Sequence, residues 1–186
     1  MNKILKLDRE FLIFLNNQGS ELYDVLWLNI TNQFTWIPLF ALILYLIFKE
    51  FGLKKSIFTF LFIVTFIVFS DQFTNTIRGI FERLRPNNDP SISHLLRPNL
   101  INPQSFSFIS GHATTSSFFT VFIILLLKHS YKWIKLLVLF PLIFAYSRIY
   151  LGVHFPSDII IGGCVGVILG FLFFQIYQKI TLKWNL

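Results

Sequence analysis

The sequence predicts an all-α integral membrane protein: a bundle of about five transmembrane helices, preceded by an amphipathic helix at the membrane surface. Of the 186 residues, 54% are hydrophobic and 24 are phenylalanine, which is too apolar for a soluble domain of this length. Most charged residues fall in short segments between long apolar runs. Neither a repeat nor a linker divides the chain, so residues 1–186 are expected to form one domain.

The first helix is predicted over residues 1–22. Apolar side chains such as Leu7 and Phe11 recur there with helical spacing, among charged side chains such as Lys6 and Asp8. The segment lacks the uninterrupted apolar core of a signal peptide. We therefore expect a helix that lies in the membrane interface, with an ordinary surface helix as the alternative.

Five further segments approach the roughly 20 apolar residues that a helix needs to cross the hydrocarbon core. The first is the least regular because Asn29, Asn32 and Gln33 interrupt it. Between the second and the third, residues 86–104 contain several proline and asparagine pairs and are expected to form a polar surface loop. The predicted spans are residues 26–48, 56–77, 112–128, 133–151 and 157–178.

The distribution of lysine predicts the orientation in the membrane. The connections 49–55 and 128–135 and the tail 179–183 hold eight of the sixteen basic residues but only one acidic residue, Glu50. The positive-inside rule places these segments in the cytoplasm, so the loop 86–104 and the amino terminus would lie outside. The formal net charge of +7 then reflects topology, and no nucleic-acid partner is expected.

Nearly all of the remaining polar chemistry lies in three short segments, residues 78–86, 107–112 and 147–158. They contain arginines, histidines, an aspartate and a Ser-Gly-His sequence. Arginine pairs bidentately with phosphoryl oxygens, and backbone N–H groups at the start of a helix bind anions. Histidine can attack phosphorus or protonate a leaving group. This combination predicts a phosphate-binding site that carries its own nucleophile.

Helical spacing relates three of the charged residues. Asp71, Arg78 and Arg85 recur every seven residues and would share one face if the second span continued outward as a helix. Asp71 is either a functional residue or a structural ion-pair partner of Arg78, and the sequence leaves both interpretations open.

A second helical relationship joins His154 to Asp158, which are four residues apart. A helix that begins near Pro156 would bring the carboxylate close to one imidazole nitrogen. Glycines at 162, 166 and 170 continue the same row along that helix. Such a row of small residues allows a neighbouring span to pack closely, which would hold the site rigid.

The three polar segments resemble the signature of the type 2 phosphatidic acid phosphatase (PAP2) superfamily, which is K-x6-R-P, P-S-G-H and S-R-x5-H-x3-D. The third part is matched in full, and the resemblance covers about residues 56–179. The matching residues are Arg78, Arg85 and Pro86; Ile109, Ser110, Gly111 and His112; and Ser147, Arg148, His154 and Asp158.

Two positions depart from this signature. Arg78 stands in place of the lysine, which keeps the positive charge but changes its geometry. Ile109 stands in place of the proline, which contributes rigidity to the turn rather than chemistry. The departures bear more on the substrate than on the catalytic chemistry.

The resemblance implies a mechanism with a covalent phosphohistidine. His154, oriented by Asp158, would attack phosphorus, and His112 would protonate the leaving oxygen and then activate water. No cofactor and no metal is expected, because arginines supply the positive charge and the histidines and acidic residues show no metal-ligand spacing. The charge on the phosphoryl group would be stabilised by Arg78, Arg85, Arg148, Ser110 and the Gly111 N–H group.

We therefore expect a phosphoric monoester or diphosphate hydrolase whose partners are the membrane and a lipid phosphate. It would lie in a bacterial inner membrane, with its site facing the periplasm or exterior. Undecaprenyl diphosphate ranks first as the substrate because the chain is small and lacks a large outer domain, ahead of lipid A, phosphatidylglycerol phosphate and phosphatidic acid. The alternatives are a lipid phosphotransferase and a non-catalytic lipid-binding protein; vanadate-dependent haloperoxidases share the motifs but are soluble.

Overall fold

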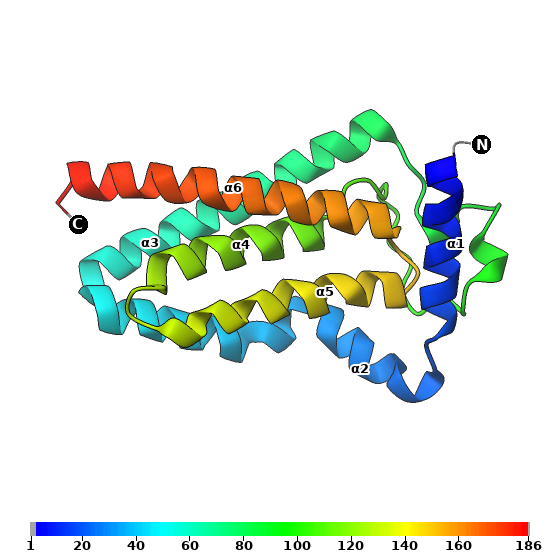
Figure 1. Ribbon diagram of the computed structural model, residues 1–186, viewed down its shortest axis with the longest axis horizontal. Helices are drawn as coiled ribbons and strands as arrows, with labels where there is room; N and C mark the ends of the chain where they lie inside the picture. Colours follow the sequence, from blue (N-terminus) through cyan, green and yellow to red (C-terminus); the bar gives the residue numbers. More distant parts are fainter. Residues whose placement is uncertain (1–2, 186) are drawn as a thin grey trace.

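A computed structural model describes residues 3–185, and the chain is all-α as the sequence predicts (Figure 1). Within residues 3–185, the chain forms α-helices and short 3-10 segments, and there is no β-strand. The α-helices are α1 (Lys3–Asn17), α2 (Glu21–Thr31), α3 (Ile37–Phe81), α4 (Gly111–Leu127), α5 (Leu139–Tyr150) and α6 (Pro156–Lys183). The 3-10 segments are η1 (Gln33–Trp36), η2 (Pro86–Asn88), η3 (Ser93–Leu95) and η4 (Lys132–Val138).

The long helix α3 supplies two of the predicted spans because it is broken at Gly52. The φ angle of Gly52 is 71°, in the left-handed region that favours glycine, and the chain reverses at this end of the bundle (Figure 1). The connection predicted at residues 49–55 is therefore a sharp break within one helix rather than a separate loop.

The first predicted span, residues 26–48, needs a correction. Its first part belongs to the separate helix α2, which ends at Thr31 and is followed by Asn32 as its C-cap residue. The Asn32 side chain accepts a hydrogen bond from the Phe34 N–H group (3.0 Å) and so caps η1. Because such a side chain competes for backbone groups, the membrane-crossing stretch begins only at Gln33.

Within residues 3–185, three helical stretches are long and apolar enough to cross a membrane: Gln33–Asn88, Lys132–Tyr150 and Pro156–Lys183. The shorter apolar helix α4 lies in the middle of the bundle and packs against α3, α5 and α6 (Figure 1). Gln33–Asn88 doubles back at Gly52, so these stretches and α4 correspond in position to the five predicted segments, and α4, with 17 residues, is shorter than a full membrane crossing.

The glycine row on α6 packs against α4, as the sequence predicts. A Cβ atom added at Gly166 would lie 2.2 Å from the Thr114 carbonyl oxygen, and one added at Gly162 would lie 2.8 Å from the Ser110 carbonyl oxygen. Any larger residue would therefore separate the two helices. This contact fixes the start of α6 relative to the start of α4.

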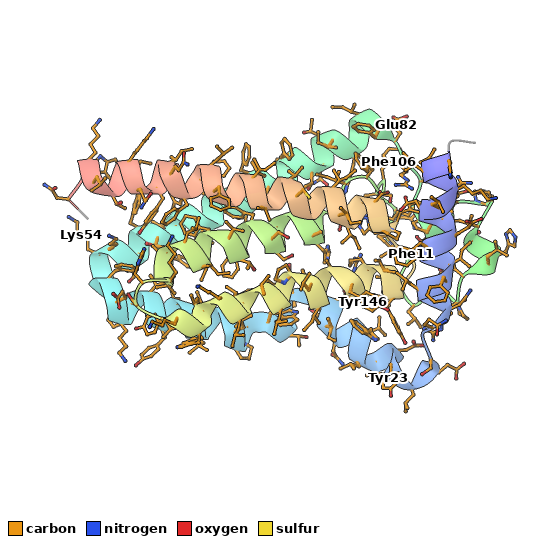
Figure 2. The ribbon with its side chains drawn as sticks, viewed as in Figure 1. Phe11, Tyr23, Lys54, Glu82, Phe106 and Tyr146 are labelled. Atoms are coloured by element: carbon orange, nitrogen blue, oxygen red, sulfur yellow. The ribbon has the colours of Figure 1, made fainter. Side chains whose placement is uncertain are left out.

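The two ends of the bundle differ in their charged residues. Lys54 lies at one end, whereas Glu82 and Phe106 lie at the other (Figure 2). The break in α3, the end of α4 and the end of α6 come together at the first end, around a pocket of about 320 Å³ that includes Lys55 and Lys128. We call this the lysine end and the opposite one the site end.

Helix α1 lies across the site end (Figure 1), and the amphipathic helix predicted over residues 1–22 forms over Lys3–Asn17. Leu7 and Phe11 on α1 are more than half exposed. The buried row of α1 is not purely apolar, because Leu12 is flanked there by Asp8 and Asn16. The Asn16 amide donates to the Tyr150 carbonyl oxygen (2.7 Å), which ties α1 to the end of α5.

Candidate active site

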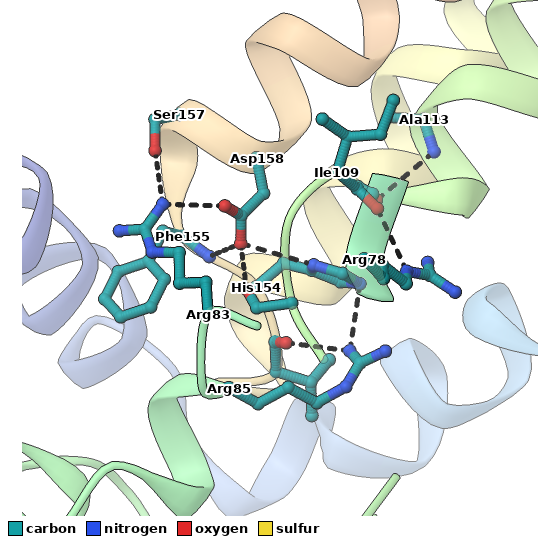
Figure 3. A network of polar contacts seen from close by, with 12 residues as sticks. Arg78, Arg83, Arg85, Ile109, Ala113, His154, Phe155, Ser157 and Asp158 are labelled. Carbon is teal, nitrogen blue, oxygen red and sulfur yellow. Dashed lines mark hydrogen bonds and ion pairs between the residues drawn. The ribbon is translucent and has the colours of Figure 1, made fainter. Parts of the chain in front are cut away.

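The three motif segments meet at the site end. They come from the end of α3 and the loop after it, the start of α4, the end of α5 and the turn before α6 (Figure 3). His154 and Asp158 are completely buried there. The sequence separates these segments by up to about 70 residues, and the fold brings them into hydrogen-bonding contact.

His154 is held between a carboxylate and a guanidinium group. Its Nδ1 atom lies 3.4 Å from Asp158 Oδ2, and its Nε2 atom lies 2.9 Å from Arg85 Nη1. Helix α6 begins at Pro156, as predicted, and Asp158 also accepts a hydrogen bond from the Phe155 N–H group (2.9 Å). The contact between Nδ1 and Asp158 sets the orientation of the imidazole ring, and Nε2 is the nitrogen that points toward Arg85.

Burial lowers the pKa of the His154 imidazole well below its usual range, and the nearby positive charges of Arg85, Arg148 and Arg78 lower it further. The ring is therefore neutral at pH 7. A neutral imidazole with Nδ1–H directed at a carboxylate leaves the lone pair on Nε2, which is the form that can act as a nucleophile.

Arg85 is buried and anchored to the backbone. Its Nη1 atom donates to the Val153 carbonyl oxygen (2.9 Å), and its Nε atom donates to the Ser105 carbonyl oxygen (2.7 Å). Nη2 donates to the Ser105 hydroxyl (2.9 Å). The guanidinium is thereby fixed beside His154, and the Nη1–H group that faces Nε2 must shift to a phosphoryl oxygen before Nε2 can attack phosphorus.

Arg78 lies against the turn that opens α4. Its Nε atom donates to the Ile109 carbonyl oxygen (3.1 Å), at the position where the signature has proline. A Cβ atom added at Gly111 would lie 3.0 Å from Arg78 Nη2, so the glycine makes room for the guanidinium. Arginine in place of lysine thus forms a planar contact with this turn that lysine could not reproduce.

Arg148 comes from the last turn of α5 and is buried. Its Nη1 atom donates to the Thr31 hydroxyl (2.6 Å), whereas its Nε atom is buried and has no hydrogen-bond partner within residues 3–185. An unpaired N–H group of a buried guanidinium is costly. A phosphoryl oxygen is an acceptor that would satisfy it.

Ser110 and His112 lie at the start of α4. Ser110 is the N-cap residue: its side chain accepts from the Ala113 N–H group (3.4 Å), and its own N–H group donates to the Asp158 carbonyl oxygen (3.1 Å). The His112 ring stacks on Phe144, with ring centroids 4.9 Å apart. The N-terminus of α4, which attracts anions, is therefore aligned with the start of α6.

Asp71 does not form the direct ion pair with Arg78 that was one of its two interpretations. Asn75 stands between them: its amide nitrogen donates to Asp71 Oδ2 (3.1 Å), and its oxygen accepts from Arg78 Nη1 (2.9 Å). Asp71 is exposed on α3. Asp71 therefore supports Arg78 through the hydrogen bonds of Asn75 and through the longer-range attraction of its negative charge.

The expectation that Arg85 shares a helical face with Arg78 is wrong. Helix α3 ends at Phe81, and Glu82 adopts a left-handed conformation with a φ angle of 47°. The chain therefore leaves the helical path before Arg85, which turns inward from the following loop. Residues seven apart share a helical face only while the helix continues, and the spacing alone does not show that α3 ends at Phe81.

Arg83 and Ser107 are site residues that the motifs did not identify. Arg83 Nη1 donates to Asp158 Oδ1 (2.7 Å), and the guanidinium lies 3.7 Å from the centre of the Phe155 ring (Figure 3). The Ser107 hydroxyl donates to Asp158 Oδ2. Both residues lie inside the polar segments 78–86 and 107–112, which is the sequence feature that could have drawn attention to them.

Among residues 3–185, no group of three or more histidine, cysteine, aspartate or glutamate side chains is arranged to hold a metal ion. The positive charge next to His154 belongs to the side chains of Arg78, Arg85 and Arg148. Their charge has the sign that a phosphoryl group requires, and their role in binding one stays a prediction.

Comparison with known proteins identifies the family. A model of the PAP2 superfamily matches residues 59–182. The lipid A 4'-phosphatase of Bacteroides thetaiotaomicron is 32% identical over 181 residues, which cover 95% of this chain and 80% of the relative. An undecaprenyl-diphosphatase of Sulfolobus acidocaldarius is 32% identical over 173 residues, which cover 92% of this chain and 72% of the relative.

The fold is also found in a solved structure. A crystal structure of a transmembrane PAP2-type phosphatidylglycerolphosphate phosphatase from Bacillus subtilis has a TM-score of 0.74 and 22% identity. The alignment covers 97% of this chain and 89% of that one. The chain therefore belongs to the PAP2 superfamily, which confirms the resemblance, and it is an integral membrane phosphatase of that type.

Proposed function

We propose that this PAP2 enzyme hydrolyses a phosphate monoester on a lipid through a phosphohistidine at His154, and that its substrate is a phosphorylated glycolipid of the lipid A type. One observation carries the proposal. The buried, neutral His154 ring has Nδ1 directed at Asp158 and Nε2 beside Arg85, in the positive field of three guanidinium groups.

In the first step, His154 Nε2 attacks phosphorus and forms an N–P bond while the bond from phosphorus to the lipid oxygen breaks. The negative charge of the bound phosphoryl group favours the protonated form of His112, which donates the proton that the lipid oxygen needs in order to leave as a hydroxyl group. Asp158 accepts a hydrogen bond from Nδ1–H and stabilises the positive charge that develops on the ring. Arg78, Arg85 and Arg148 stabilise the oxygens of the phosphoryl group.

In the second step, water attacks the phosphohistidine. His112, now neutral, takes a proton from this water as the N–P bond breaks, so His154 and inorganic phosphate are released and His112 returns to its acid form. The Ser110 cap fixes the start of α4, which carries His112, so the same histidine is available for both steps.

The charges around the site favour one phosphate over two. Outside the set of three arginines, the basic side chains near the site are already paired: Arg83 with Asp158, and Arg97 with Asp24. A diphosphate would bring a second phosphate without a further arginine to receive it. A monoester matches the positive charge that is available.

The similarity to known relatives also favours lipid A over undecaprenyl diphosphate as the substrate. The lipid A 4'-phosphatase aligns over a larger share of this chain and of its own length than the undecaprenyl-diphosphatase does. The proposal therefore places lipid A ahead of undecaprenyl diphosphate, which the sequence alone ranked first. Undecaprenyl diphosphate is the second candidate because the undecaprenyl-diphosphatase is 32% identical to this chain, the same identity as the lipid A 4'-phosphatase.

We also propose that the enzyme lies in a bacterial inner membrane with the site end facing outward. The lysine end and the site end are opposite ends of the bundle (Figure 2), which is the arrangement that the positive-inside rule requires. A lipid headgroup at the outer surface would then reach the arginines while its chains stay in the hydrocarbon.

The test is phosphate release by the purified protein in detergent with EDTA present. The panel contains lipid A with its 4'-phosphate, undecaprenyl diphosphate, phosphatidylglycerol phosphate and phosphatidic acid. We expect the highest kcat/KM with lipid A, and none with His154→Ala. Faster hydrolysis of undecaprenyl diphosphate would make that lipid the substrate in place of lipid A. Activity that requires added magnesium would contradict the mechanism.

A further inference from the structure

The two oxygens of Asp158 have different partners. Oδ2 faces His154 Nδ1 and accepts from the Phe155 N–H group and the Ser107 hydroxyl. Oδ1 points the other way and accepts from Arg83 Nη1 (2.7 Å). The angle at which Asp158 presents Oδ2 to His154 therefore depends on what holds Oδ1.

Arg83 is itself held by a second carboxylate, from α1. Its Nη2 atom donates to Asp8 Oδ2 (2.7 Å), while its Nη1 atom also donates to the Ser157 hydroxyl (2.8 Å). The guanidinium thus bridges Asp8 and Asp158 and lies over the Phe155 ring. Such a planar, multiply bonded arginine has little freedom to move.

Asp8 is built into the start of α6. It is 8% exposed, whereas Lys6 and Glu10 on the same helix are exposed. Its Oδ1 atom accepts from the Ser157 N–H group (2.8 Å), one of the unpaired donors in the first turn of α6. Asp8, from α1, therefore caps the first turn of α6, which is the turn that carries Asp158.

We propose that Asp8 and Arg83 are positioning residues for the phosphatase reaction: they fix the Asp158 carboxylate so that it orients His154. The proposal rests on the roles given above to His154 and Asp158. Without Asp8, the charge of Arg83 is balanced by Asp158 alone, and the carboxylate can turn from His154 toward the guanidinium. The imidazole then loses the partner that sets its tautomer and stabilises its charge in the transition state.

Helix α1 offers a matched control. A second ion pair, from Arg9 Nη2 to Asp89 Oδ2 (3.1 Å), also ties α1 to the rest of the molecule. It leads to the loop after α3 and makes no contact with Asp158. The charge of Asp89 reaches Arg83, but removing it tests the docking of α1 with the hydrogen bonds from Asp8 through Arg83 to Asp158 in place.

The experiment compares Asp8→Asn, Asp8→Glu, Arg83→Lys and Asp89→Asn with the parent, measuring kcat and KM for a lipid phosphate and the rate of phosphoenzyme formation by rapid quench. We expect kcat and that rate to fall about 10- to 100-fold in Asp8→Asn, as for other residues that orient a catalytic group, with KM nearly unchanged. Arg83→Lys should show the same pattern because lysine has a single nitrogen in place of the two with which Arg83 reaches Asp158 and Asp8. Asp8→Glu should recover most of the loss, and Asp89→Asn should stay close to the parent.

Full kcat in both Asp8→Asn and Arg83→Lys would overturn the proposal, and so would an equal loss in Asp89→Asn, which would reduce the effect to the docking of α1. If Asp8→Asn does not fold, Asp8→Glu and Arg83→Lys decide the question. His154→Ala, assayed in parallel, distinguishes a failure of the proposed function from a failure of the positioning role. Activity in that variant contradicts the proposed function, whereas an inactive His154→Ala with a fully active Asp8→Asn contradicts the positioning role alone.

Discussion

The site end and the lysine end use charge in opposite ways. At the site end Arg85, Arg148 and Asp158 are buried, and hydrogen bonds fix their positions. At the lysine end side chains such as Lys54 and Lys132 are exposed. Buried charges retain their strength because water does not screen them, whereas exposed lysines act as hydrated point charges. One end is thus suited to chemistry and the other to orientation in the membrane.

The largest expected effect is at His154. His154→Ala should lower phosphate release on the order of 10⁴-fold or more, because it removes the group that forms the covalent bond. His129, which lines the pocket at the lysine end, is the matched control, and His129→Ala should retain the parent rate. Comparable losses in both variants would remove the distinction between the two ends.

The next effect concerns the arginines. Arg85→Lys should lower kcat by about 100-fold or more, since a lysine cannot replace the hydrogen bonds that hold the charge beside His154. Arg78→Lys restores the residue of the family signature, yet we expect a loss of about tenfold, or roughly 1.4 kcal/mol, because Arg78 spans Asn75 and Ile109. Full activity in Arg78→Lys would show that Arg78 acts only as a point charge.

A smaller effect is expected along the contact that joins the two ends. Gly166→Ala should destabilise the fold by about 1 to 3 kcal/mol, because its Cβ would overlap the backbone of α4. Gly79→Ala is the control: no atom lies within 4 Å of its Cβ, so the substitution should be neutral or stabilise the helix. The midpoint of thermal unfolding in detergent distinguishes them, and equal midpoints would contradict the close packing.

The topology itself can be tested without changing the rate. In a Cys164→Ala background, a cysteine at Ser91 should react in intact cells with a membrane-impermeant maleimide, and one at Ser130 should react only after permeabilisation. Both serines are exposed, at the site end and the lysine end respectively. The reverse labelling pattern would place the site in the cytoplasm and exclude a substrate at the outer surface.

How much the sequence could predict depends on how far apart in the chain the interacting residues lie. The apolar runs, the start of α6 at Pro156 and the glycine row on α6 follow from local composition and spacing, and the structure has all of them. The end of α3 before Arg85 was missed because it depends on a single left-handed residue, Glu82. Asp8 was missed because its partners lie 75 and 149 residues away, beyond any periodic pattern.

The most direct test of the central claim is to trap the intermediate. The enzyme is mixed with a lipid phosphate that carries radiolabelled phosphorus and is quenched within the first turnover, in the parent and in His154→Ala. The account predicts a labelled protein in the parent, with a bond that is stable in base and labile in acid, and no label in the variant. Label in His154→Ala, or an unlabelled parent that releases phosphate at its full rate, would contradict it.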